Sequence, residues 1–161
     1  MKHAALLALL VPFALGAAAL GGCAPRPEPV AALPDFSACV AAQPAMEVMD
    51  KFLAAFNAKD TPGFEATFHY PHMRIASYPL QVLTGPGQQD DIFGNLASED
   101  WAKSRWDART IVQCGKDKAH ILATFGRLHA DGTEYATYDG LYVIELRDGF
   151  WGITVRSTFA P

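Results

Sequence analysis

Residues 118–159 read KAHILATFGRLHADGTEYATYDGLYVIELRDGFWGITVRSTF, and this stretch decides the fold. Within it, residues 118–129, 134–145 and 150–159 alternate apolar and polar side chains and are rich in β-branched and aromatic residues, as strands are. Residues 109–114 precede them and have the same character. The connections are so short that neighbouring strands must be antiparallel. The sequence therefore predicts a meander of four long strands, with turns at Gly115-Lys116-Asp117, Asp131-Gly132 and Asp148-Gly149.

The two-residue period of a strand assigns side chains to faces of this sheet. Tyr138 is expected on the same face as Tyr142, and Arg156 on the face opposite Ile153. Asp139-Gly140 has the composition of a turn, but dividing the run there would leave two short strands. We interpret it as a bulge or bend that helps the sheet to curl.

Helices are predicted before the meander. Residues 44–57 carry apolar side chains at helical spacing, and Pro44 fits the first turn of a helix. Asp60 or Thr61 is expected to cap a second, shorter helix, which ends before Tyr70-Pro71.

Two short strands and a third helical region are expected next. Residues 72–77 and 81–83 read as strands, and residues 88–96 read as the third helical region. Ser98 is expected to cap a continuation of that region, with acidic side chains in its first turn and basic ones in its last turn. This continuation would end near Trp106.

Helices gathered before a curved antiparallel sheet make an α+β domain in which the helices cover one face of the sheet. This order of elements resembles the nuclear transport factor 2-like superfamily, whose cone-shaped fold includes SnoaL-type cyclases and ketosteroid isomerases. The resemblance covers residues 45–159, and the fold that it implies hosts many functions. It is carried by Met49-x-x-Phe52-Leu53-x-x-Phe56, by Phe68-His69-Tyr70-Pro71-His72-x-Arg74-Ile75 and by Trp151-Gly152-Ile153-x-x-Arg156-Ser157.

The start of the chain has a different character. Lys2 and His3 precede an uncharged apolar run that ends in Leu20-Gly21-Gly22-Cys23, the layout of a removable secretory signal. This motif resembles the lipobox of bacterial lipoproteins, which implies cleavage before Cys23 and lipidation of its thiol. A retained transmembrane helix and a plain secretory signal are the alternatives.

Three segments follow from the lipobox: a signal peptide at residues 1–22, a lipidated cysteine with a proline-rich tether at residues 23–43, and a folded domain at residues 44–161. The expected location is the bacterial cell envelope, with the protein attached to the membrane only through its lipid. Ala24 follows the cysteine, and by the sorting pattern of lipoproteins this favours the outer membrane, facing the periplasm.

Cys39 and Cys114 are then the cysteines left to pair, in a compartment where disulfides persist. A disulfide and two buried thiols are both consistent with the sequence. The formal net charge is −4 and the basic residues are scattered, so a nucleic-acid partner is not expected.

Candidate site residues follow from the resemblance, because such cones enclose a pocket whose few polar side chains decide the function. We expect His72, Arg74, Trp106, Tyr138 and Arg156 around the pocket mouth. His72 and Tyr138 are the candidates for moving protons, and the arginines for holding an anionic oxygen. The alternative is structural: the arginines pair with Asp107 or Asp139 and the aromatic residues belong to the core.

Metal and cofactor motifs are weak or missing in the sequence. His69-x-x-His72 lacks a third ligand at a suitable spacing, and we find no glycine-rich phosphate loop and no Gly-x-Ser-x-Gly elbow. No metal and no cofactor are therefore expected. Ketosteroid isomerases carry a general-base aspartate after the second helix, but this chain has no acidic residue from Ala66 to Gln89.

Three functions stay open. The first is a non-catalytic domain that binds a small apolar or amphipathic molecule or a protein partner. The second is a cofactor-independent lyase, isomerase or cyclase that uses His72, Tyr138 and Arg156. The third is a structural envelope protein, and a homodimer through the outer face of the sheet is expected from the resemblance.

Overall fold

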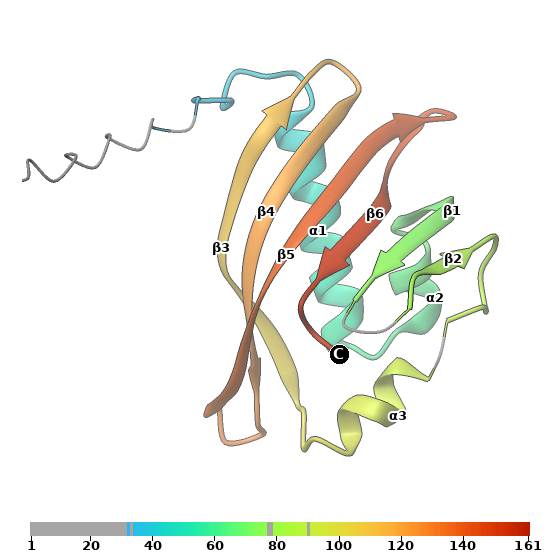
Figure 1. Cartoon of the computed structure of the whole chain (residues 1–161), viewed down its shortest axis with the longest axis vertical. Coiled ribbons are helices and arrows are strands. Elements are labelled where there is room, and N and C mark those ends of the chain that lie inside the picture. The colour runs from blue at the N-terminus through green and yellow to red at the C-terminus, as the bar shows by residue number, and fades with distance from the viewer. Residues whose placement is uncertain (1–31, 33, 77–78, 90) are drawn as a thin grey trace, which may run out of the picture. The chain divides into compact units, whose positions relative to one another are not determined.

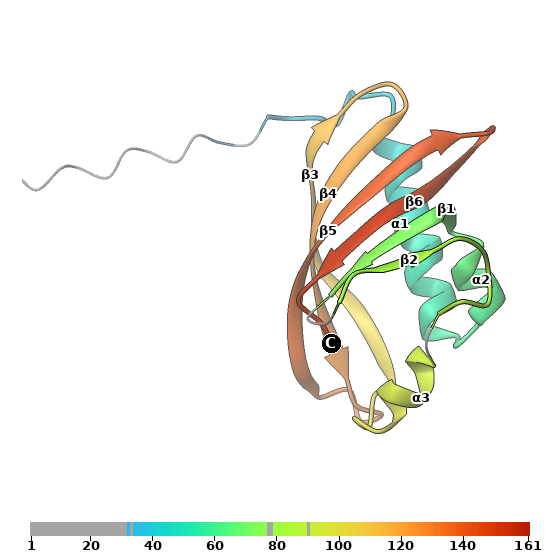
Figure 2. The same ribbon diagram turned by 45° about the vertical axis from the view of Figure 1, so that its right-hand side comes forward.

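The structure is a computed structural model that describes residues 32, 34–76, 79–89 and 91–161. The predicted lipobox, and residues 23–31 and 33 of the predicted tether, lie outside the described residues. The α+β fold is confirmed: three helices lie on one side of a six-stranded, mostly antiparallel sheet (Figures 1 and 2). Within the described ranges, we find no helix long and apolar enough to cross a membrane.

The helices are α1 (Ala42–Asn57), α2 (Thr61–Glu65) and α3 (Ile92–Ala97). α1 begins two residues before Pro44 and ends at the expected residue. Asp60 caps α2, because its carboxylate accepts a hydrogen bond of 3.1 Å from the backbone nitrogen of Gly63. Asp91 caps α3 in the same way, through the backbone nitrogen of Gly94 at 2.9 Å.

The strands have the order β2-β1-β6-β5-β4-β3 across the sheet. The long C-terminal strands form the predicted antiparallel meander, and the short β2 is confirmed at its predicted bounds. β1 joins the meander by lying parallel to β6, a pairing that the sequence pattern does not indicate. The bounds are β1 Phe68–Ile75, β2 Gln81–Leu83, β3 Lys103–Cys114, β4 Lys118–Leu128, β5 Glu134–Arg147 and β6 Phe150–Thr158.

The predicted helical continuation to Trp106 is wrong. Ser98 lies at the C-terminal end of α3, and Asp100 has a positive φ of 54°, which an α-helix does not accommodate. β3 begins at Lys103, where its pairing with Leu128 of β4 starts. A long neighbouring strand therefore overrides the helix-like charge pattern of this segment.

The first strand also begins earlier than predicted. β1 starts at Phe68 and runs through Tyr70-Pro71, so the dipeptide does not end a helix but lies within a strand. Strands accommodate proline at irregular positions. Pro71 lies in the stretch between Phe68 and Met73 where the pairing of β1 with β6 shifts its register.

Asp139-Gly140 does not form a bulge. β5 continues through both residues in unbroken register with β4, and Gly140 is paired with Thr158 of β6. A Cβ atom on Gly140 would lie 2.9 Å from the side chain of Thr158 and 3.0 Å from the carbonyl oxygen of Ser157. Glycine is needed here because the neighbouring strand approaches closely.

The predicted assignment of side chains to the two faces of β6 is wrong, because this strand contains a bulge. The β5–β6 pairing shifts its register between Val143 and Ile144, and Thr154 is the extra residue on β6. An extra residue reverses the alternation of faces beyond it. Ile153 and Arg156 are consequently both buried, not on opposite faces as predicted.

Cys39 and Cys114 form a disulfide with their Cα atoms 6.2 Å apart. It joins the segment before α1 to the end of β3. Ala41, between the disulfide and α1, is fully buried in the hydrophobic core. The packed part of the chain thus begins before Pro44.

Candidate functional site

Four polar side chains form a row across neighbouring strands. Arg74 of β1 is paired with Gln81 of β2 on one side and with Arg156 of β6 on the other. Arg156 is paired in turn with Tyr142 of β5. The parallel pairing of β1 with β6 creates this row from residues that are far apart in the sequence.

Both arginines of the row are buried, each only 4% exposed. Arg156 lies among aromatic rings: its guanidinium carbon is 5.5 Å, 5.3 Å and 5.7 Å from the ring centroids of Phe52, Phe64 and Phe68. These distances fall in the range of cation–π attraction, which offsets part of the cost of burying a charge.

Arg74 is held by hydrogen bonds to neighbouring residues of β1 and β6. Its Nη1 donates to Oγ1 of Thr158 at 2.8 Å and to the carbonyl oxygen of Ile75 at 3.4 Å. The two aspartates considered as structural partners bond elsewhere: Asp107 accepts from Arg105 at 2.6 Å, and Asp139 accepts from Thr124 at 2.7 Å.

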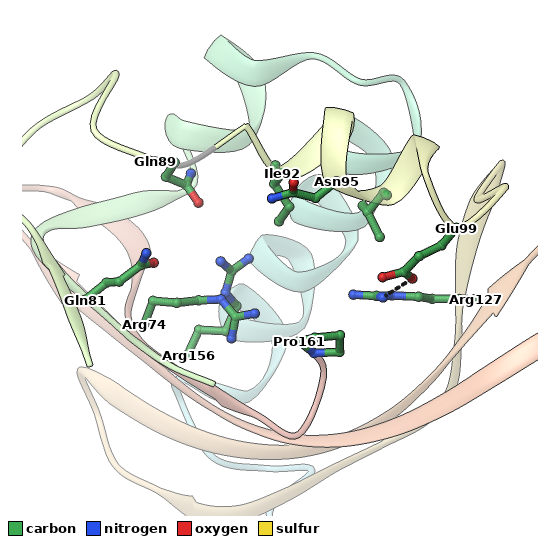
Figure 3. A pocket seen from close by; sticks show the side chains of 10 residues that line it. Arg74, Gln81, Gln89, Ile92, Asn95, Glu99, Arg127, Arg156 and Pro161 are labelled. Carbon is green, nitrogen blue, oxygen red and sulfur yellow. Dashed lines mark hydrogen bonds and ion pairs between the residues drawn. The ribbon is translucent and has the colours of Figure 1, made fainter. Parts of the chain in front are cut away.

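A cavity of about 340 Å³ lies against this row of side chains. Arg74 and Arg156 reach into it from the sheet, while Ile92 and Asn95 of α3 face them from the other side (Figure 3). Gln89 also lines it, and its buried side-chain nitrogen has no hydrogen-bond partner within the described residues. The cavity thus offers charged and neutral donors.

The apolar interior behind this cavity is filled by side chains. A narrow space of about 40 Å³ continues inward past Arg156, walled by Phe52, Phe56 and Tyr142. The aromatic rings there pack on one another, with centroids 6.0 Å apart for Phe52 and Phe56 and 5.7 Å apart for Trp106 and Tyr142. The space is far below the usual size of a ligand pocket.

Glu99 and Arg127 line another side of the cavity. Nη1 of Arg127 donates to Oε2 of Glu99 at 2.7 Å, and the hydroxyl of Tyr135 donates to the same oxygen at 3.2 Å. The Arg127 guanidinium also lies 4.9 Å from the ring centroid of Tyr138. In Figure 3 this ion pair lies apart from Arg74 and Arg156, with Pro161 between them.

Comparison with known families identifies the domain. A family model described as "NTF2-like protein (DUF6841)" matches residues 42–159. The chain belongs to this NTF2-like family. Among curated proteins, none is similar enough to be counted as a relative.

Solved structures share the fold of this NTF2-like protein. An NTF-2 like protein of unknown function from Shewanella oneidensis has 12% identity and a TM-score of 0.55, over 73% of this chain and 97% of that one. A ketosteroid isomerase-like protein from Erwinia carotovora atroseptica has 20% identity and a TM-score of 0.56, over 74% and 95%. At these identities the similarity shows the fold alone.

His72, predicted at the pocket mouth, lies inside the NTF2-like domain instead. Its ring is fully buried and stacked on Phe68 at 4.0 Å between centroids, and it does not line the cavity. Nδ1 lies 3.0 Å from the carbonyl oxygen of Ile153, so Nδ1 carries the proton. Burial, together with the charges of Arg156 and Arg74, lowers the pKa of His72 to about 3. The ring is therefore neutral and inaccessible.

The remaining predicted residues divide between the cavity and the core. Arg74 and Arg156 line the cavity, and Trp106 lines only the narrow space behind it. Tyr138 lines neither and packs against Phe125 at 5.7 Å between ring centroids. The structure therefore brings the two arginines together at the cavity and leaves both proposed proton carriers, His72 and Tyr138, out of its lining.

Sequence reasoning missed several lining residues of the cavity. Arg127 had a detectable signal, because Ile121, Ala123 and Phe125 alternate inward on β4 and Arg127 is the next inward position. An arginine that continues a buried apolar face is unusual. Glu99 and Gln89 lie in loops, where side chains do not alternate between two faces, so the sequence does not indicate that they line the cavity.

The paired histidines do not build a metal site. His69 lies away from the cavity, with Nε2 3.0 Å from the carbonyl oxygen of Glu145 and its ring packed on Phe150. Across the described ranges, no group of three histidine, cysteine or acidic side chains is placed to hold a metal ion.

Proposed function

We propose that this NTF2-like domain binds a small amphipathic molecule through an anionic group, without converting it. The observation that carries the proposal is the pairing of two buried arginines, Arg74 and Arg156, at the wall of a 340 Å³ cavity. Guanidinium groups are the preferred partners of carboxylate and phosphate groups, because their donors match the geometry of these anions.

The polar lining narrows the ligand class expected from the sequence. A purely apolar molecule would leave the side-chain nitrogen of Gln89, which has no hydrogen-bond partner in the described part of the chain, without solvent or a partner, which is costly. An anionic head group satisfies donors of this kind, while Ile92 and Leu96 provide an apolar wall for the rest of the molecule.

The position of the titratable groups favours binding over chemistry. A general base must lie within hydrogen-bond reach of the proton that it removes. His72 is buried behind the cavity, with its pKa lowered to about 3 by burial and by the nearby arginines. A mechanism that uses His72 and Tyr138 together with Arg156 has no support from this arrangement.

The domain acts in the bacterial envelope, held there by lipid on Cys23. Two features support this location: Leu20-Gly21-Gly22-Cys23 has the pattern of a lipobox, and the Cys39–Cys114 disulfide is of a kind that persists in oxidising compartments. Mass analysis of the mature protein checks it. A diacylglyceryl cysteine at the N-terminus is expected, and an unmodified product that starts elsewhere contradicts it.

The binding proposal is tested by thermal unfolding of the purified protein with matched ligand pairs. Pentanoate and benzoate carry the expected charge, and pentanamide and benzamide have the same shapes without it. At about ten times its Kd a ligand contributes about 1.4 kcal/mol, which raises the unfolding midpoint by about 5 °C. A rise with the acids alone supports the proposal. Equal rises with acids and amides, or none, contradict it.

A further inference from the structure

Glu99 gives the cavity a second, chemically different end. The carboxylate and its partner Arg127 lie on one side of the cavity, while Arg74 and Arg156 lie together on another (Figure 3). A ligand that spans the cavity from the paired arginines to its other charged side therefore reaches the Glu99–Arg127 ion pair.

The ion pair is held by burial of Arg127 and by Tyr135, which does not line the cavity. Arg127 is only 5% exposed, and its Nη1 lies 2.7 Å from Oε2 of Glu99. Tyr135 donates to the same oxygen. Burial of Tyr135, and the adjacent Glu99, raise the pKa of its hydroxyl to about 12, so the hydroxyl stays a donor over the physiological range.

One oxygen of Glu99 is left for a ligand. Oε2 accepts from both Arg127 and Tyr135, whereas Oε1 has no hydrogen-bond partner in the described part of the chain. The side chain of Glu99 is 35% exposed, so the carboxylate is accessible. A carboxylate oxygen can only accept, so it favours a hydroxyl or ammonium group and repels another anion.

We propose that Glu99 selects ligands with one anionic group and a hydrogen-bond donor at the opposite end, and that it rejects dianions. This inference rests on the proposed anion binding at Arg74 and Arg156. Arg127 does not serve as a second anion site, because Glu99 already occupies it. The ligand class is therefore a hydroxy acid or an amino acid with separated ends, and not a dicarboxylate.

Calorimetric titration with ligands of equal length tests the selection. Pentanoate, 5-hydroxypentanoate, 5-aminopentanoate and glutarate differ only in the group at one end, and the six-carbon series samples a longer reach across the cavity. The wild-type protein is expected to bind the hydroxy or the amino acid at least about tenfold more tightly than pentanoate, and glutarate more weakly than pentanoate.

The variant Glu99→Gln reverses this order. It removes the repulsive charge and releases Arg127, so glutarate is expected to gain at least about tenfold in affinity while the amino acid loses its advantage. Glu47→Gln removes a carboxylate from the exposed surface of α1 and is expected to leave all affinities unchanged. Circular dichroism establishes that both variants are folded.

The outcomes separate the two proposals. Tight binding of pentanoate with no preference for a terminal donor overturns the role of Glu99 and leaves anion binding in place. If glutarate binds most tightly to the wild-type protein, the role of Glu99 is likewise overturned and anion binding is left in place. Failure of every acid to bind overturns both proposals.

Discussion

Arg74 and Arg156 occupy paired positions on the parallel strands β1 and β6, and both side chains are buried. Two guanidinium groups at adjacent positions repel each other, and each loses solvation on burial. The rings around Arg156 and the Thr158 hydroxyl beside Arg74 offset part of this cost. A bound anion would offset more of it, which links the stability of this region to its proposed function.

Removal of either charge is predicted to weaken anion binding. Arg74→Gln and Arg156→Gln keep a hydrogen-bond donor but lose the positive charge, so the affinity for pentanoate should fall by at least about tenfold in calorimetric titration. Arg105→Gln is the matched control, because Arg105 is exposed on β3 and does not line the cavity. Unchanged affinity in both cavity variants would rule out the arginine row as the binding site.

His72 is predicted to make the fold sensitive to mild acid. Its pKa is about 3 in the folded domain and 6.5 for an ordinary histidine, so below about pH 6.5 the unfolded chain binds a proton that the folded chain does not. The free energy of unfolding should fall by about 2 kcal/mol from pH 6.5 to about pH 5, through this group alone, and above pH 6.5 the group has no effect.

Urea unfolding at several pH values measures this dependence. His72→Phe keeps an aromatic ring against Phe68 and should remove the slope between pH 6.5 and about pH 5. Leu122→Phe is the control, because it places a ring on β4 without removing a titratable group, and it should leave the slope as it is. Parallel pH profiles for the wild type and His72→Phe would show that His72 is not buried as a neutral ring.

The disulfide is predicted to contribute substantially to stability. Cys39 and Cys114 are separated by 75 positions, and closing a loop of this length stabilises a fold by about 4 kcal/mol in the chain-entropy model. Cys39→Ala/Cys114→Ala should lower the free energy of urea unfolding by an amount of this order. Dithiothreitol should lower the stability of the wild type and not that of the double variant. Wild-type unfolding that is the same with and without reductant would refute the contribution.

Gly140 is predicted to be irreplaceable for packing reasons. In Gly140→Ala the new methyl group would press on Thr158, whose hydroxyl holds Arg74, and on the backbone at Ser157. We expect a loss of about 1–3 kcal/mol in the free energy of unfolding, together with weaker binding of pentanoate. Gly85→Ala is the control, since a Cβ atom there has no neighbour within 4 Å. Equal stability of the two variants would contradict the close approach of β5 and β6.

The meander was predictable because its signals are local. Period-two alternation and short turns such as Asp148-Gly149 determine antiparallel neighbours without reference to the rest of the chain. The pairing of β1 with β6 has no such signal, since it depends on how distant segments pack. In the segment from Ser98 to Trp106 the local signal is misleading. Its charges are distributed as in a helix, but pairing with β4 makes much of it a strand.

The site was predictable only in part for the same reason. Alternation places His72 and Arg74 on one face of β1, as observed, but it does not show which of them reaches a cavity and which lies under aromatic rings. The bulge at Thr154 places Arg156 on the same face of the sheet as Ile153. The alternation of apolar and polar residues in the sequence does not reveal where a strand contains a bulge. Glu99 lies in a loop, which has no regular alternation of side chains from which its position at the cavity could be predicted.

Anion binding at Arg74 and Arg156 is tested most directly by a crystal structure of the purified protein with 5-bromopentanoate. Density for the carboxylate is expected about 3 Å from the guanidinium nitrogens of Arg74 or Arg156, with the anomalous signal of bromine in the same cavity. Bromine located elsewhere on the protein, or a cavity that holds only water at saturating ligand, would contradict it.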